Sequence, residues 1–172
     1  MTFEEMARKR YSVKQFSERP VEKEKLQKIL EIANLAPTAK NAQCFRIYVL
    51  KSREALEKAR ELTPCIYGAP VALMFTYDVR EAFRYPDDKE AVNSGAEDCS
   101  IAATHVMFAA MEVGLGTCWV NFFAPSKAKE VFHIPQNEEV VLLMPLGYAA
   151  ETAAPLPNHA KKKALSGLVI EL

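Results

Sequence analysis

Apolar residues recur at helical spacing in three parts of this sequence. Over residues 22–37 they return every three or four positions, which predicts an amphipathic helix ended by a proline. The same spacing predicts a second helix over residues 52–62, which opens on a serine suited to capping. Over residues 94–113 apolar side chains cover most of the helical circumference. We therefore expect this helix in the middle of the molecule or at an interface.

Shorter helices and several strands complete the pattern. Thr2 and Glu5 form a capping box that opens a helix to about residue 9, and a brief helix is expected over residues 125–132. Alternating or uniformly apolar runs predict strands at 45–50, 70–77 and 139–146, and a short extended segment at 119–123. Residues 79–93 are polar without periodicity, so we expect a mobile loop of the kind that often determines specificity.

These elements predict an α+β fold. We expect one domain over residues 1–172, with a small mixed, mainly antiparallel sheet flanked by helices. The last residues, 169–172, are strand-like but follow a stretch rich in proline and lysine that lacks helical periodicity. Such a segment would suit an exposed sheet edge, and its alternative is a frayed terminus.

Composition and charge exclude several classes of function. The 22 basic and 22 acidic side chains among 172 residues cancel, which removes the argument for a nucleic acid or an anionic membrane as partner. The longest apolar runs are too short to span a bilayer, and residues 1–5 do not resemble the start of a secretory signal. The four cysteines and three histidines are scattered without the spacing of a metal site. We therefore expect a cytoplasmic protein with reduced thiols and no structural metal.

The first segment with chemical potential runs from Arg10 to Phe16. In extended backbone, Arg10, Ser12 and Lys14 point to one side, because alternate residues share a face. Two cations and a hydroxyl offer more donors than a carboxylate can use. They suit a phosphate monoester, which carries a charge of about −1.5 to −2 and three acceptor oxygens. The alternative is a solvated basic segment after a short helix.

The second segment covers residues 36–43. Pro37 and Thr38, among small and polar neighbours, indicate a turn that offers hydroxyl and amide groups just after a helix. Asn41 could donate to or accept from ring or ribityl oxygens of a ligand, or it could only stabilise the turn.

Together these segments resemble the signatures of the FMN-dependent nitroreductase family. That family has alternating arginine, serine and basic residues closed by phenylalanine, followed by a segment of the form A-P-S/T-x-x-N-x-Q-P-W. The present chain departs from the second signature at Cys44 and Phe45, where proline and tryptophan are usual. Further matches lie at residues 114–125, 145–148 and 159–168, so the resemblance spans nearly the whole chain in the right order.

The resemblance implies a bound FMN, whose phosphate would be held by Arg10, Ser12 and Lys14. Lys161 and Lys163 would add cations from the tail, although any residue of the run Lys161 to Lys163 could serve. The backbone of the segment containing Val120 and Asn121 would lie along the flavin ring, with an amide near N5. Tyr11 would either pack or contact the cofactor, and a second set of contacts would come from a partner subunit: Pro37, Thr38 and Asn41.

The resemblance also implies a homodimer and a redox activity. The tail would cross to a second subunit of a two-fold dimer, with the FMN sites at the interface. NAD(P)H would reduce the protein in a ping-pong reaction, and a nitroaromatic, quinone or similar electron-poor acceptor would then take its place. No titrating catalytic residue is required, because the flavin carries the redox chemistry.

Two alternatives remain within this resemblance. A specialised flavin dehydrogenase or dehalogenase would recognise its substrate through the loop over residues 79–93, with Arg80, Arg84, Tyr85, Asp87 and Asp88. A flavin-binding carrier or sensor without turnover would account for Cys44 and for Asn121, which stands where many members of the family carry glycine. Cys44 itself is interpreted first as a small buried residue and only second as a redox thiol.

Overall fold

The sheet of this protein has four strands in the spatial order β1–β2–β4–β3. The structure, a computed structural model, describes residues 1–87 and 92–172. The strands are β1 (Phe45–Leu50), β2 (Val71–Asp78), β4 (Glu138–Gly147) and β3 (Gly116–Thr117), and all three pairings are antiparallel. An isolated parallel bridge between Ser12 and Thr117 extends the sheet beyond β3. The predicted mixed, mainly antiparallel sheet is therefore confirmed.

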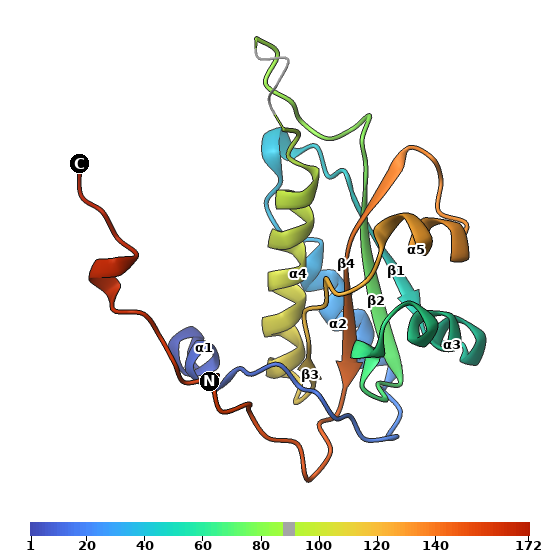
Figure 1. Ribbon diagram of the computed structural model, residues 1–172, viewed down its shortest axis with the longest axis vertical. Coiled ribbons are helices and arrows are strands. Elements are labelled where there is room, and N and C mark those ends of the chain that lie inside the picture. Colours follow the sequence, from blue (N-terminus) through green and yellow to red (C-terminus); the bar gives the residue numbers. More distant parts are fainter. Residues whose placement is uncertain (88–91) are drawn as a thin grey trace.

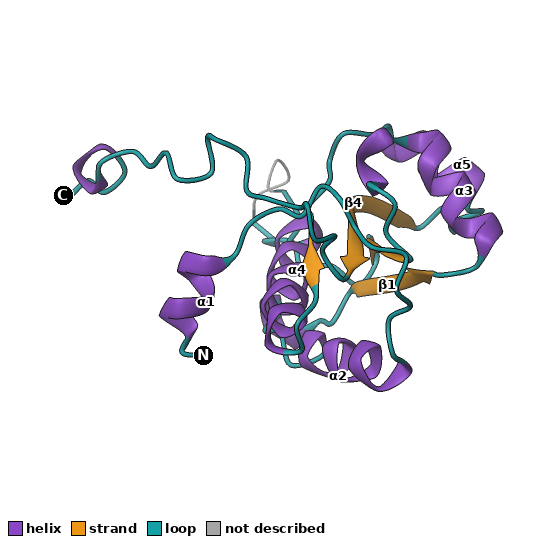
Figure 2. Cartoon of the chain, turned by 90° about the horizontal axis from the view of Figure 1, so that it is seen from below, coloured by secondary structure: helices purple, strands orange, loops and turns teal. Residues whose placement is uncertain are grey.

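Helices cover both faces of the sheet (Figure 2). On one face lie α2 (Lys23–Ala33) and α4 (Gly95–Glu112), and on the other lie α3 (Arg53–Leu62) and α5 (Pro125–Val131). Along β2 the side chains alternate between the two layers: Leu73 and Phe75 pack in the cluster with α2 and α4, whereas Ala72 and Met74 pack in the other cluster. The period of two in a strand explains how one sheet serves two cores.

The region after α4 differs from the sequence prediction. The expected extended segment at 119–123 is replaced by β3 at Gly116–Thr117, followed by a single bridge between Val120 and Leu143. Between them the Cys118 N–H donates to the carbonyl of Pro145 at 3.3 Å. Pro145 has no N–H to return, so the ladder is interrupted there. The helix expected to continue to Pro37 also stops early, at Ala33.

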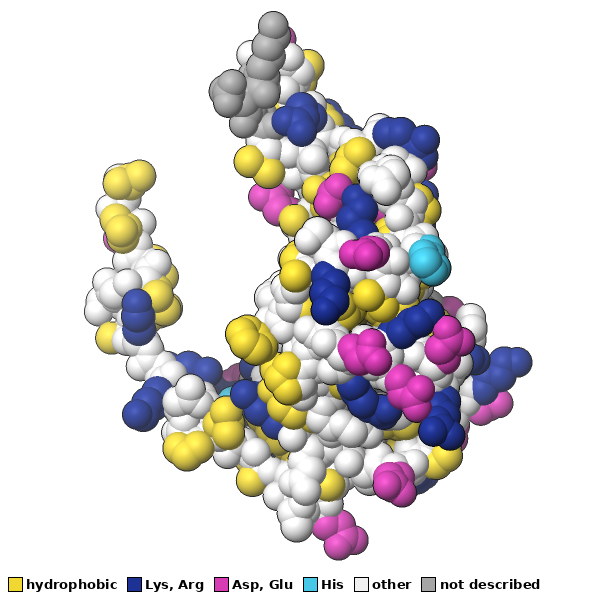
Figure 3. All heavy atoms as spheres, turned by 45° about the vertical axis from the view of Figure 1, so that its right-hand side comes forward, with side chains coloured by type: hydrophobic (Ala, Val, Ile, Leu, Met, Phe, Trp, Pro, Cys, Tyr) yellow, Lys and Arg dark blue, Asp and Glu magenta, His cyan; other side chains and the backbone are white. Residues whose placement is uncertain are grey.

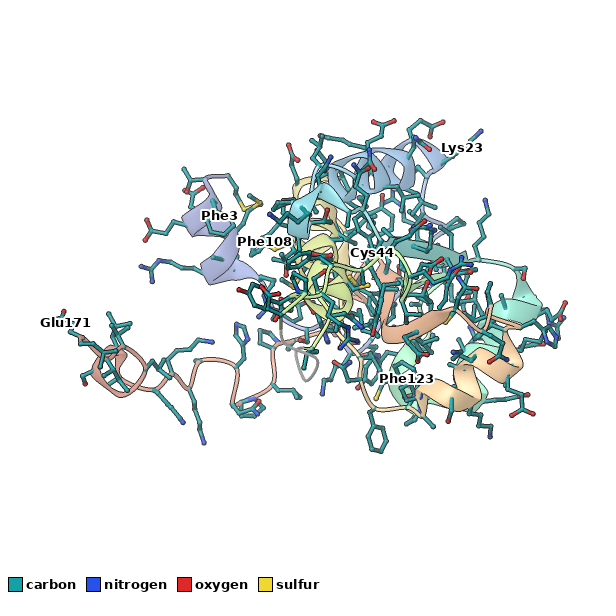
Figure 4. All side chains as sticks on the ribbon, turned by 90° about the horizontal axis from the view of Figure 1, so that it is seen from above. Phe3, Lys23, Cys44, Phe108, Phe123 and Glu171 are labelled. Carbon is teal, nitrogen blue, oxygen red and sulfur yellow. The ribbon has the colours of Figure 1, made fainter. Side chains whose placement is uncertain are left out.

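Two segments stand apart from the layered body (Figure 1). One is α1 (Phe3–Lys9), whose Phe3 ring lies 4.9 Å from that of Phe108 on α4, and Figure 4 shows the two rings side by side. The other is the tail from Ala149 onward, which ends in a single 3-10 turn at Leu165–Gly167 and exposes apolar side chains at its end (Figure 3). Residues 169–172 form no strand within the chain, so tail exchange in a dimer stays a prediction. No helix of the described ranges is both long and apolar enough to cross a bilayer.

Tyr148 joins the end of β4 to the start of α2. Its hydroxyl donates to the carboxylate of Glu22 at 2.7 Å and accepts from Lys25, which also donates to the Val113 carbonyl at the end of α4. Arg19 stacks on the ring at 3.9 Å. The hydrogen bond from Tyr148 is the main reason that the pKa of Glu22 falls from 4.5 to about 2.

We expect Tyr148→Phe to weaken this corner in a pH-dependent way. A carboxyl whose pKa is lowered by folding stabilises the native state above its unfolded pKa, and this contribution fades as the pH falls toward the folded value. The variant should therefore be less stable than the native protein at pH 6, and the difference should shrink between pH 4.5 and about 2. Urea unfolding across this range measures it. Tyr85→Phe, at an exposed tyrosine, is the control, and a pH-independent difference would contradict the role of Glu22.

Candidate functional site

The segment from Arg10 to Phe16 runs as an added strand along the outer edge of β3. Ser12 bridges Thr117 in parallel register, and the N–H of Val13 donates to the Thr117 carbonyl at 3.0 Å. Further along, Phe16 bridges Ala149 in antiparallel register, just where the tail begins. The segment is thus fixed between the sheet and the first residues of the tail.

The predicted alternation of side chains holds only in the middle of this segment, at Val13 and Lys14, because Gln15 is exposed and Phe16 is buried. Val13 and Phe16 are buried, whereas Lys14 is exposed. Gly116 permits the close approach of Val13, because a Cβ at position 116 would lie 2.4 Å from a methyl carbon of that valine. Arg10 and Ser12 are half-buried. The buried Val13 and Phe16 anchor the segment, which leaves its polar positions for a ligand.

A hollow of about 340 Å³ lies between this segment and the tail. Ser12 and Lys14 form one side, and the tail supplies the rest through Leu156, Asn158, His159, Lys161 and Lys162. Arg10 lines an adjoining hollow of about 490 Å³ together with His159 and Lys162. Lys163 lines neither hollow, so within one chain the geometry favours the first two lysines of the run.

Four of the cations around these hollows have no carboxylate partner in the described part of the chain. Among residues 1–87 and 92–172, no ion pair involves Arg10, Lys14, Lys161 or Lys162. The carboxylate of Glu4, which lines the larger hollow, is paired with Arg8 at 2.8 Å. Several unpaired cations around adjoining hollows repel each other, and a multiply charged anion would relieve this repulsion.

Tyr11, within the segment, and Cys118, beside it, show no sign of a catalytic role. The ring of Tyr11 packs edge-on against His159, with centroids 6.5 Å apart, and so holds the tail beside the segment. Burial raises the pKa of the Cys118 thiol, and the nearby Lys14 and Ser12 offset this effect only in part. The thiol therefore stays protonated and behaves as a packed side chain.

Val120 and Asn121 lie on the same edge of β4 as Thr117. Val120 exchanges both backbone hydrogen bonds with Leu143, at 2.9 and 3.0 Å. The Asn121 side chain accepts from the Trp119 indole at 2.6 Å and donates to the Val141 carbonyl at 2.9 Å. Its backbone N–H has no acceptor in the part of the chain that the structure describes. This amide is available to a ligand, whereas the Asn121 side chain is committed to its own segment.

The turn containing Pro37, Thr38 and Asn41 lies elsewhere, at the N-terminal end of α4 (Figure 1). The N–H of Ala39 donates to a carboxyl oxygen of Asp98 in the first turn of that helix, at 2.9 Å. The helix α4 has 18 residues and is therefore about 27 Å long. The turn lies at its N-terminal end, and the segment from Arg10 to Phe16 lies beyond its C-terminal end. One chain therefore does not bring the two predicted sets of contacts together.

The comparison with known proteins agrees with this architecture. The model of the nitroreductase family matches residues 7–65 and 61–148, which include both signature segments, α4 and all four strands. The chain belongs to the nitroreductase family. A family protein from Clostridium difficile 630 has a solved structure that is 34% identical, with a TM-score of 0.91, 99% of this chain covered and 98% of that one.

Of two other proteins similar to this chain, one is named for an activity and the other has a structure with a bound ligand. A protein of Methanothermobacter thermautotrophicus, named as a candidate NADH dehydrogenase or NAD(P)H nitroreductase, is 30% identical over 86% of this chain and 77% of its own length. A candidate nitroreductase of Exiguobacterium sibiricum was solved in complex with FMN. It is 18% identical to this chain with a TM-score of 0.84, and the match covers 100% of this chain and 98% of that one. This likeness shows a shared fold.

The unusual Cys44 of this nitroreductase is fully buried, and its thiol donates to Asp98 at 3.3 Å. Burial is the main reason that its pKa rises to about 12, so the thiol stays protonated. This supports the interpretation of Cys44 as a buried residue over that of a redox thiol. Neither Cys44 nor the side chain of Asn121, which is folded back on Trp119, offers specific support for a carrier function.

The loop residues of this nitroreductase have separate surroundings. Arg80 forms an ion pair with the buried Asp78 at 2.6 Å and thereby holds the pKa of that carboxyl well below its usual range. Tyr85 and Asp87 are exposed. Arg84 is also exposed, and its side chain interacts with another group of the protein. Asp88 lies outside the described residues. Arg80 is therefore committed to the end of β2.

Sequence reasoning missed three polar residues of this nitroreductase. Asn158 and His159 line the hollow beside Ser12, and the match of the tail to the family ending was a usable signal for His159. Asp98 lies within the helix predicted over residues 94–113 and had no separate role in the sequence analysis. Its spacing to the buried Ala102 and Val106 places it on the inner face of α4, which was the signal that it is not a surface acid.

Proposed function

We propose that this protein is an FMN-dependent oxidoreductase that passes electrons from NAD(P)H to a nitroaromatic, quinone or similar electron-poor acceptor. Membership of the nitroreductase family and the relatives' names support the enzyme class and the cofactor. In the proposed ping-pong order, oxidised nicotinamide leaves before the acceptor enters the same place.

The hollow beside Ser12 and Lys14 carries this proposal. It is walled by cations without carboxylate partners, so it fits the phosphate of FMN, which has a charge of about −1.5 to −2 and three acceptor oxygens. Arg10, Lys14 and either Lys161 or Lys162 would supply charge, and the Ser12 hydroxyl a neutral contact. The segment is anchored by Val13 and Phe16, so these groups are placed before the ligand arrives.

The rest of the proposed site orients the ring. Bound FMN supplies the redox chemistry, accepting a hydride equivalent from the nicotinamide and releasing electrons to the acceptor. The free N–H of Asn121, on the same sheet edge as Thr117, is a donor for a ring atom. Because the side chain of Asn121 is held by Trp119 and Val141, it fixes the direction of this N–H.

We further propose that the functional unit is a two-fold homodimer. The turn with Pro37, Thr38 and Asn41 is about an α4 length from the phosphate hollow, so it would serve the site of the partner subunit. The exposed apolar end of the tail is consistent with a segment that a second subunit covers.

A visible absorption spectrum of the purified protein, repeated after anaerobic addition of NADH, tests the proposal. We expect a flavin spectrum that bleaches, steady NADH oxidation when menadione is added, and a molar mass in light scattering of twice 19.3 kDa. A flavin that bleaches once but does not turn over would indicate a carrier. A colourless protein that ignores added FMN would refute the proposed cofactor.

A further inference from the structure

The carboxyl group of Asp98 lies in the first turn of α4 and is only 2% exposed. Its Oδ1 accepts the N–H of Ala39 at 2.9 Å, and its Oδ2 accepts the hydroxyl of Ser94 at 2.9 Å and the thiol of Cys44 at 3.3 Å. Figure 4 shows Cys44 in the interior of the molecule. A carboxyl group is rarely buried without such partners, so its three donors together account for its position.

Asp98 holds the turn at both of its ends, and this turn needs outside support. Lys40, Asn41 and Gln43 all have φ between 50° and 55°, a left-handed backbone conformation that residues other than glycine seldom adopt. Such residues persist only where neighbouring contacts impose the conformation. Thr38 supplies one contact from inside the turn, because its hydroxyl oxygen accepts the Gln43 N–H at 3.0 Å. Asp98 supplies the contacts from outside the turn.

The same carboxyl group reaches the base of the loop over residues 79–93. Ser94, which donates its hydroxyl to Asp98, accepts the N–H of Phe83 at 3.2 Å on the same oxygen. The backbone N–H of Ser94 donates to the Phe83 carbonyl at 2.8 Å. Lys40 of the turn lies 5.9 Å from the centre of the Phe83 ring, which makes a second link between turn and loop.

We propose that Asp98 is a positioning residue that fixes the turn from Thr38 to Cys44 and couples it to the loop at Phe83. The inference rests on the proposed function, in which the turn contacts the flavin of the partner subunit. It also gives Cys44 a purpose, because the thiol provides a donor to the carboxyl group that the proline usual in the family cannot provide.

Modification of Cys44 by N-ethylmaleimide tests the first half of this proposal without reference to activity. We expect Asp98→Ala to raise the rate of Cys44 alkylation at least tenfold, because the turn opens when the carboxyl group that holds it is removed. Asp98→Asn should raise this rate less. The half-buried Cys65 is the internal reference. Glu97→Ala removes an exposed carboxyl from the same helical turn and should leave both rates unchanged. Native rates at Cys44 in both Asp98 variants would overturn the proposal.

Flavin binding tests whether the turn that Asp98 fixes serves the cofactor, which is the proposed function on which this inference rests. We expect Asp98→Ala to raise the FMN dissociation constant at least tenfold and to change the visible circular dichroism of bound flavin, with Asp98→Asn closer to the native protein. Faster labelling of Cys44 with native affinity and spectrum would overturn the coupling of the turn to the cofactor. If Asp98→Ala does not fold, Asp98→Asn decides. If the native protein binds no FMN, the proposed function fails, whereas the labelling still decides whether Asp98 holds the turn.

Discussion

The double variant Arg10→Ala, Lys14→Ala is expected to bind FMN at least 100-fold more weakly than the native protein. Each lost charge-assisted hydrogen bond to a phosphate costs about 1.5–3 kcal/mol, and each 1.4 kcal/mol corresponds to about a tenfold change in affinity. Both side chains line the two hollows described above, and neither forms an ion pair with a carboxylate of the described residues. Flavin fluorescence titration measures the effect.

A matched control separates this site from the overall charge. Lys51→Ala, Lys127→Ala removes the same charge from exposed positions that line neither hollow, and we expect FMN affinity within about threefold of native. Thermal melting of both double variants checks that the fold is intact. Equal affinity in the two double variants would show that the phosphate does not lie between Arg10 and Lys14.

Gly95→Ala is expected to destabilise the protein by about 2 kcal/mol, although alanine normally favours a helix. An added Cβ at this position would lie 2.0–2.4 Å from three ring carbons of Tyr77, including the one next to its Cβ. The ring cannot avoid this clash by moving only its tip, so either the ring leaves its site or the first turn of α4 shifts. Urea unfolding measures the loss.

Gly167→Ala is the matched substitution for this experiment. No atom outside the immediate chain lies within 4 Å of a Cβ built at Gly167, and we expect a change below about 0.5 kcal/mol. If Gly95→Ala were equally neutral, Tyr77 would be free to leave its packed position. A large effect would instead show that the start of α4, which carries Ser94 and Asp98, is fixed by close packing.

Local pattern was sufficient for most of the fold. The apolar spacing predicted helices over residues 22–37 and 94–113, and the structure has them at Lys23–Ala33 and Gly95–Glu112. The alternation predicted from Arg10 to Phe16 holds at Val13 and Lys14 but fails at Gln15, which is exposed, and at Phe16, which is buried. The capping box of Thr2 and Glu5 is also formed as expected. The roles of the site residues came from resemblance to a family and stay predictions.

The remaining features depend on contacts between distant residues. The position of β3 follows from Pro145, which is far along the chain and breaks the ladder on a neighbouring strand. The role of Asp98 follows from its meeting with Ala39 and Cys44, more than 50 residues away. The approach of Lys162 to the hollow depends on the path of a tail without regular structure. Periodicity carries no information on any of these.

The length of α4 has a genetic consequence in the proposed dimer. Because each chain holds the segment from Arg10 to Phe16 beyond one end of this helix and the turn at the other, every site of that dimer would be assembled from two copies of the gene product. A copy defective at Arg10 and a copy defective at Asn41 would each be inactive alone. Paired in one dimer, they would restore one intact site opposite one that carries both lesions, so two null alleles would complement each other.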